Sequence, residues 1–250
     1  MVVHAMNPVE AFDIDIINRV RAIWTVRPEL RAVYYEWFEE LLRSAEGLRP
    51  VVEIGSGPGF FKEHSPHLIA TDLIRSPWID VVCDAAGLPF KSGAVGAVVM
   101  VDVLHHLPKP LDFMGEVARV LRPGGHLAMI EPWITPFSFV LWRFFHHEDC
   151  HLCIDLACPF NGTKKAFDGN SAIPFKLLRD FQGGRKAPLQ LLRAEAFLGL
   201  PYLVTLGFKL SRPIPFWCVR VARRFERLLV PLRRVLATRI LLVWESPRNG

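Results

Sequence analysis

The sequence predicts an α/β protein built on a doubly wound, mostly parallel, seven-stranded sheet with N-terminal helices and lid insertions. Two features predict this fold class. Short β-branched segments alternate with helical patterns between residues 48 and 132, as in sheets whose parallel strands are connected by helices. The first of these segments, residues 51–54, leads directly into a glycine-rich turn and the start of a helix. We expect one domain over residues 1–250, because a chain of this length can bury one full core.

Residues 1–47 are expected to form N-terminal helices. Apolar side chains recur at helical spacing from Phe12 to Trp24, and a second apolar face follows Pro28 as far as Leu42. Gly47 is the predicted C-cap of the second helix. Helices in this position commonly cover a sheet edge or a pocket, and plain core packing explains most of their aromatic residues.

Residues 48–132 are expected to form the ligand-binding core. Its predicted elements are strands at residues 51–54, 68–71, 81–82, 97–103 and 126–130, and a helix at residues 111–121. Glu53, Asp72 and Asp84 fall at or beside the carboxyl ends of the first three strands. Because doubly wound sheets bind ligands beyond these ends, the three acids are expected to border a binding site.

A glycine turn follows the first strand. Gly55, Gly57 and Gly59 remove every second Cβ there, so a ligand can approach the backbone closely. The N–H groups of such a turn suit an anionic or strongly polar ligand. The dinucleotide fingerprint G-x-G-x-x-G requires glycine where this chain has Phe60, so a dinucleotide site is disfavoured.

Five ordered motifs together resemble a known family. Glu53 to Gly59 reads E-x-G-x-G-x-G, and it is followed by ATDL, VVCDAAGLPF, AVVMVDVLHHL and RVLRPGGHLAMIEP. In order and spacing these segments resemble the motifs of the Rossmann-like, class I S-adenosylmethionine-dependent methyltransferases of small-molecule type. The chain departs from the family at the head of the fourth strand, where Gly96 and Ala97 stand in place of a frequent Asp.

The resemblance implies S-adenosylmethionine as the cofactor and assigns roles to single residues. Asp72 would accept the ribose hydroxyls, Asp84 the adenine amine, and Glu53 would support the turn and the cofactor's ammonium. For each acid the alternative is a helix N-cap or a turn former. The predicted cofactor-binding residues are Glu53, Gly55, Ser56, Gly57, Gly59, Asp72, Leu73, Asp84, Ala85, Val101 and His105.

Residues 133–200 are expected to form a substrate lid. This segment combines aromatic residues with a cluster of His, Asp, Glu and Cys side chains. His147 and Glu148 are the predicted catalytic pair, because a His beside an acid can serve as a general base. Cys150 and Cys153 lack a matching second pair, so no metal site is predicted.

Residues 201–250 are expected to form a terminal hairpin interrupted by a basic amphipathic helix. The predicted strands are residues 202–210 and 239–244, with a helix between them that is broken near Pro231. From residue 203 onward ten Lys or Arg oppose two Glu. Two interpretations stay open: a helix packed on the enzyme with solvated arginines, or an interfacial helix that contacts anionic lipid.

We therefore expect an enzyme that transfers a methyl group to a small or lipid-linked organic acceptor. The alternatives are an RNA or protein methyltransferase that docks through the basic helix, and a non-catalytic interaction module of the same fold. Nucleic acid is disfavoured because the basic helix face lacks interleaved aromatic residues. Without an apolar run of ~18 residues, a secretory signal pattern or a disulfide framework, we expect a cytoplasmic protein, with peripheral contact at the inner face of the membrane as an extension.

Overall fold

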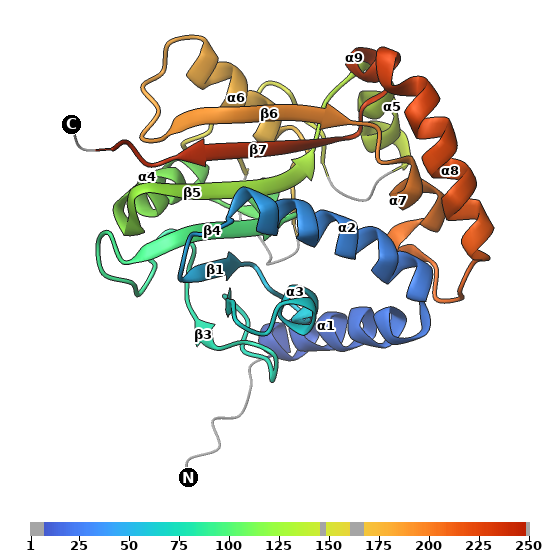
Figure 1. Ribbon diagram of the computed structural model, residues 1–250, viewed down its shortest axis with the longest axis horizontal. Coiled ribbons are helices and arrows are strands. Elements are labelled where there is room, and N and C mark those ends of the chain that lie inside the picture. Colours follow the sequence, from blue (N-terminus) through green and yellow to red (C-terminus); the bar gives the residue numbers. More distant parts are fainter. Residues whose placement is uncertain (1–7, 146–148, 161–167, 249–250) are drawn as a thin grey trace.

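The sheet has the predicted doubly wound architecture. The computed structural model describes residues 8–145, 149–160 and 168–248 (Figure 1). Seven strands lie in the order β3-β2-β1-β4-β5-β7-β6, in which β1 to β5 pair in parallel and β7 runs antiparallel to β5 and β6. The strands are β1 (Val51–Ile54), β2 (Ile69–Asp72), β3 (Val81–Val82), β4 (Val95–Val101), β5 (Leu121–Pro132), β6 (Gln190–Phe197) and β7 (Arg239–Glu245).

Helices cover both faces of the sheet. The described helices are α1 (Pro8–Val26), α2 (Pro28–Ser44), α3 (Phe60–His64), α4 (Pro110–Val120), α5 (Pro136–Phe145), α6 (Ile173–Gln182), α7 (Leu200–Thr205), α8 (Phe216–Leu229) and α9 (Arg233–Leu236), with the 3-10 turns η1 (Leu104–His106), η2 (Gly207–Lys209) and η3 (Val230–Leu232). In Figure 1, α2 crosses in front of the sheet, and α5, α7, α8 and α9 lie at the end to which β1 and β5 point.

Strand β5 shows how the two cores arise. Successive side chains of a strand point to opposite faces. Leu127 and Met129 enter the core formed with α4 and α6, whereas Ala128 and Ile130 enter the core formed with α2. All four are buried, which explains why the central strands read as nearly continuous apolar runs.

The N-terminal helices are fixed to the C-terminal part of the chain by a buried ion pair. Arg27, between α1 and α2, lies with its Nε 2.5 Å from Oε1 of Glu29, and both side chains are fully buried. The Arg27 guanidinium also donates to the carbonyls of Thr205, Gly207 and Leu210. The two predicted helices are confirmed, but α2 is C-capped by Ala45, so the prediction of Gly47 as the cap is wrong.

The predicted position of the sixth strand is also wrong. Residues 202–210 form α7 and η2, and the strand that pairs with β7 is β6, Gln190–Phe197. Gly199 has φ +68° and precedes Pro201 in the first turn of α7, a favourable helix start. β6 lies at the sheet edge and most of its side chains are exposed, so it lacks the apolar alternation of the other strands. The segment predicted as a lid therefore reaches only to β6, and the insertion in the antiparallel hairpin begins at residue 198.

The family departure at Gly96 has a steric cause. A Cβ built on Gly96 would lie 2.4 Å from the backbone nitrogen of Arg49. No side chain fits there, so an Asp at this position would push the segment before β1 away from β4.

Candidate active site

The glycine turn after β1 is open toward one side only. Gly55, Gly57 and Gly59 all have positive φ, between +47° and +73°. A Cβ on Gly55 would lie 2.4 Å from the Val103 side chain, and one on Gly59 would lie 2.4 Å from Cβ of Trp78. A Cβ on Gly57 would meet no atom within 4 Å. Packing therefore requires the outer two glycines, whereas the middle one leaves its backbone accessible to a ligand.

Asp72, at the end of β2, holds the turn in place. Its Oδ2 accepts the Gly57 N–H at 2.7 Å and its Oδ1 accepts the Ile74 N–H at 2.8 Å. Burial raises the pKa of the Asp72 carboxyl, and these N–H donors act in the opposite direction. A carboxylate oxygen can accept a second hydrogen bond, so Asp72 can also bind a diol beside the turn.

Glu53 and Ser56 place unsatisfied polar atoms beneath the turn. Glu53 Oε2 and Ser56 Oγ are buried and make no hydrogen bond of normal geometry within the described part of the chain, although Ser56 is near enough to lower the pKa of Glu53. Burial raises the pKa of Glu53 to about 8. Because buried polar atoms without partners are rare, this pair indicates a polar ligand group, and a primary ammonium would satisfy both.

Residues after β2 and β3 form the adjoining rim. Leu73 follows Asp72 and is 63% exposed, an apolar surface beside a carboxylate. Asp84 is exposed and accepts the Ala86 N–H at 2.8 Å, while Ala85 is buried. Pairing of β2 with β3 places both segments at the same edge of the sheet. Their surface suits a flat, polar-edged ring.

A buried carboxylate clamps the loop after β4. Glu131, near the end of β5, accepts the N–H groups of Val103 at 2.8 Å and Leu104 at 2.7 Å through Oε1. Its Oε2 lies 2.7 Å from Nδ1 of His105. The predicted cofactor residue Val101 ends β4 just before this loop, and His105 is held within the clamp, 2% exposed.

An ion pair joins the same loop to β7. Asp102 has φ +57° and pairs with the guanidinium of Arg239. Arg239 is buried beneath the rings of Trp37, Trp142 and Tyr202, whose centroids lie 5.2, 5.9 and 4.7 Å away. Burial raises the pKa of Asp102, and the Arg239 charge lowers it. Glu131 and Arg239 were missed by the sequence analysis; Glu131 stood at a strand end like the other acids, but Arg239 carried no such signal.

Asp102, His105 and Glu131 bring possible metal ligands together, with their donor atoms within 4.8 Å of one another. Both carboxylates already have strong partners: the guanidinium for Asp102, two N–H groups for Glu131. We therefore interpret this cluster as a hydrogen-bonded network. In the segment predicted as a lid, burial raises the pKa of Cys150 to about 11.

The predicted catalytic residues His147 and Glu148 lie outside the described residues. Nearby, Asp149 forms a bridge with Asn170, whose N–H donates to the carbonyl of His105 at 2.9 Å. Asn170 thus contacts both Asp149 and the loop after β4.

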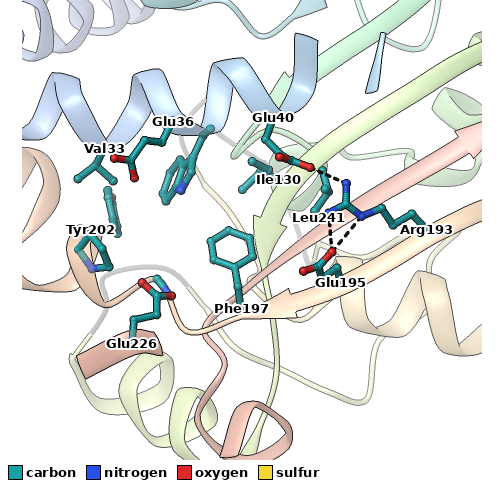
Figure 2. A pocket seen from close by; sticks show the side chains of 13 residues that line it. Val33, Glu36, Glu40, Ile130, Arg193, Glu195, Phe197, Tyr202, Glu226 and Leu241 are labelled. Atoms are coloured by element: carbon teal, nitrogen blue, oxygen red, sulfur yellow. Dashed lines mark hydrogen bonds and ion pairs between the residues drawn. The ribbon is translucent and has the colours of Figure 1, made fainter. Parts of the chain in front are cut away.

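A separate cavity of about 250 Å³ lies between α2 and strands β5, β7 and β6 (Figure 2). Arg193 on β6 joins Glu40 on α2 to Glu195 at one end of it. Trp37 and Tyr202 line it and pack on Arg239. The glycine turn does not line this cavity, so it is distinct from the cradle formed by residues 53–59 and Asp72.

Comparisons with known proteins identify the fold and the motifs. Residues 52–129 match the model of a family described as a methyltransferase domain. A solved geranyl diphosphate C-methyltransferase from Streptomyces coelicolor A3(2), in complex with Mg²⁺, geranyl diphosphate and S-adenosyl-L-homocysteine, has the same fold, with a TM-score of 0.54 and 15% identity over 84% of this chain and 80% of that chain. Residues 52–129 thus match a methyltransferase domain, within a chain that has the fold of a solved methyltransferase. The predicted resemblance is confirmed over residues 52–129, and solved structures of this fold contain S-adenosylmethionine or S-adenosyl-L-homocysteine.

Curated relatives match the chain over its core. An uncharacterized methyltransferase of Mycobacterium sp. (strain JLS) is 29% identical over 123 residues, which are 43% of this chain and 48% of the relative. A phthiotriol/phenolphthiotriol dimycocerosates methyltransferase of Mycobacterium leprae is 47% identical over 45 residues, 18% of this chain and 17% of the relative. A mouse tRNA (carboxymethyluridine(34)-5-O)-methyltransferase is 31% identical over 107 residues, 38% of this chain and 16% of the relative. The chain thus matches half or less of the length of each.

Proposed function

We propose that this methyltransferase transfers a methyl group from S-adenosylmethionine to a small, apolar or lipid-linked organic acceptor. One observation carries the proposal: the open backbone at Gly57 lies between the Asp72 carboxylate and the buried polar atoms of Glu53 and Ser56, which make no hydrogen bond of normal geometry within the described residues. This donor and acceptor set matches a molecule with a diol at one end and an ammonium at the other. When bound, the cofactor supplies a methyl group that its sulfonium has already activated.

The residues of the cradle have distinct roles in this proposal. Asp72 accepts the ribose hydroxyls through the lone pairs that Gly57 and Ile74 leave open. Leu73, Asp84 and Ala85 contact the adenine. Glu53, as the carboxylate, and Ser56 bind the ammonium. The backbone beside Val101 faces the methionine end.

The loop after β4 positions the reacting groups. Glu131 fixes the backbone at Val103 and Leu104, and the Val103 side chain packs on Gly55. A rigid wall here holds the cofactor in one orientation, and orientation can supply as much as ~7–11 kcal/mol of barrier reduction. His147 and Glu148 remain the proposed base for an acceptor that must lose a proton.

The lid supports an apolar acceptor. Trp133 follows β5 and lies with its ring centroid 5.1 Å from that of Phe175 in α6, and Trp142 of α5 is buried beside them. Two proteins with related sequence or fold carry names that refer to geranyl diphosphate and to phthiotriol or phenolphthiotriol dimycocerosates.

Transfer to RNA is the second candidate, supported by the tRNA methyltransferase relative and by the basic C-terminal segment. A labelled-methyl assay separates the candidates. The protein is incubated with methyl-labelled S-adenosylmethionine and, in parallel, with the organic-solvent extract, the aqueous metabolites and the total tRNA of a bacterial cell. We expect label in the organic-solvent fraction. Label in tRNA alone would overturn the lipid-type acceptor, and no transfer to any fraction by a protein that binds the cofactor would contradict the proposed activity.

A further inference from the structure

The C-terminal helical segment exposes a large apolar surface. Its members, which we call the apolar ridge, are between 37% and 74% exposed: Trp217, Val221, Phe225, Leu228, Leu232 and Val235. They lie on the consecutive elements α8, η3 and α9. An apolar surface of this extent on a folded protein usually marks a binding site.

The packing of α8 explains why the ridge faces outward. Val219 and Ala222 are buried against the rest of the protein. On the same side, Arg223 pairs with Glu36 of α2, and Glu226 Oε1 accepts the Gly199 N–H at 2.7 Å. Three kinds of contact thus fix the orientation of α8. A helix that simply packs on its own enzyme would bury the ridge, and the structure does the opposite.

Arginines flank the ridge. Residues 216–236 contain six Arg and one Glu, and that glutamate is Glu226, which binds the Gly199 N–H. Five of the arginines are exposed and form no ion pair within the described part of the chain: Arg220, Arg224, Arg227, Arg233 and Arg234. The outward sides of α8 and α9 therefore combine apolar side chains with uncompensated positive charge.

The ridge adjoins the lid. Helix α5, the first helix of the lid, contacts α9, and Thr135 before α5 donates from Oγ1 to the carbonyl of Ala237 after α9 at 2.8 Å. α5 also exposes Phe137, Val140 and Phe144. Figure 1 shows α5, α8 and α9 at the same end of the sheet, the end that carries the cofactor cradle.

We propose that the apolar ridge and its flanking arginines dock on the surface of an anionic lipid bilayer. Apolar and aromatic side chains of an amphipathic helix enter the interfacial region while basic residues contact lipid phosphates. Each basic residue near such a surface strengthens binding about fivefold. A second copy of the chain is a poorer occupant, because ridge-to-ridge packing would bring the arginines of both copies together.

Docking places α5 and the lid at the bilayer, so the acceptor is taken from the lipid phase. This last step rests on the proposed function, whereas docking itself does not. The two are tested separately: cofactor affinity is measured on the same preparation that is used for vesicle binding.

Flotation with vesicles tests the inference. The full chain is mixed with vesicles of equal phosphatidylglycerol and phosphatidylcholine, or of phosphatidylcholine alone, at low and high salt. Two variants probe the two parts of the surface: Phe225→Ser with Leu228→Ser, and Arg220→Gln with Arg224→Gln and Arg227→Gln. The matched control, Lys91→Gln with Lys109→Gln and Lys186→Gln, removes the same charge from exposed positions elsewhere. Thermal unfolding verifies that each variant is folded.

We expect the wild type and the control to float with anionic vesicles at low salt, and to bind at least about tenfold more weakly to neutral vesicles or at high salt. Both test variants are expected to lose about tenfold or more in partitioning. If the wild type binds S-adenosylmethionine but does not float with anionic vesicles, docking is overturned and the proposed function is left intact. A concentration-dependent dimer that the Phe225→Ser, Leu228→Ser variant abolishes would assign the ridge to self-association instead.

Discussion

Nδ1 of His105 lies 2.7 Å from Oε2 of Glu131, although the two residues are 26 positions apart in the chain. The same carboxylate accepts two backbone N–H groups of the loop after β4 through its other oxygen. One buried side chain therefore fixes three successive residues of the loop that borders the proposed cofactor site. Because η1 also contacts the lid through Asn170, the clamp connects the lid to the glycine turn.

Substituting Glu131 by Gln should destabilise the protein by about 1.5–3 kcal/mol, because the two backbone N–H groups then donate to a neutral amide oxygen and no longer to a carboxylate. Urea unfolding measures this. Glu195→Gln is the control: that carboxylate is exposed and paired with Arg193, so its loss should cost at most about 1 kcal/mol. Equal losses in the two variants would show that Glu131 does not clamp the loop.

The raised pKa of Glu53 predicts a pH-dependent stability. The pKa is about 8 in the folded chain and near 4.5 when unfolded, so the folded state binds more protons between these values. The free energy of unfolding of the ligand-free protein should therefore fall as pH rises from about 4.5 to 8. Glu53→Gln removes this contribution, and its stability should decline less than that of the wild type over the same range. Parallel pH profiles of the two proteins would contradict the assignment.

Cofactor binding should reverse the protonation of Glu53. An ammonium beside this carboxyl favours its charged form, so binding at pH 7 should release up to about one proton. Calorimetry in two buffers of different ionisation enthalpy measures the number. Release should be near zero in Glu53→Gln. Proton-neutral binding by the wild type would place the ammonium elsewhere.

The glycine turn offers a matched pair of variants. A methyl group at Gly57 enters open space, whereas one at Gly55 lies 2.4 Å from Val103. Both positions have positive φ, which costs an Ala about 1–2 kcal/mol in each case. Gly57→Ala should stay folded and lose most of its S-adenosylmethionine affinity, while Gly55→Ala should be clearly less stable. Normal cofactor affinity in Gly57→Ala would mean that the ligand does not approach the turn there.

His147→Ala should lower turnover several-fold or more while cofactor affinity stays unchanged, if His147 serves an acceptor that must lose a proton. His151→Ala is the control within the same segment. His151 is exposed, and its Nε2 lies 3.6 Å from Oδ1 of Asp149, a long ion-pair distance. Steady-state rates with an identified acceptor, together with calorimetry, make the comparison. Wild-type turnover in His147→Ala would remove it from the proposed chemistry.

Local patterns predicted the parts of the fold that local sequence determines. β1, β2 and β4 are apolar, β-branched runs bounded by glycine or acidic residues, and their positions agree with the prediction within two residues. β6 was not predicted because an edge strand exposes side chains such as Arg193 and Glu195, so its apolar and polar residues need not alternate. Residues 202–210 have strand-like composition, but Gly199 and Pro201 start a helix there.

The candidate site likewise contains residues that local sequence patterns indicate and residues that they do not. Glu53, Asp72 and Asp84 were predicted as site residues because parallel strands bring their carboxyl ends to one edge, and that binding role stays a prediction. Glu131 carried the same signal at the fifth strand. The role of Arg239 depends on Asp102 and on aromatic rings from α2, α5 and α7. These residues lie far apart in the chain, so the sequence around Arg239 does not predict its role.

Calorimetric titration of S-adenosylmethionine into the wild type and into Asp72→Ala tests the central claim most directly. Asp72 would bind the ribose through charge-assisted hydrogen bonds of about 1.5–3 kcal/mol each, so the wild type should bind one equivalent and the variant should bind more than tenfold more weakly. Asp112→Ala, which removes an exposed carboxylate on α4, should bind like the wild type. Equal affinity in Asp72→Ala and the wild type, or no binding by either, would contradict the cofactor site described here.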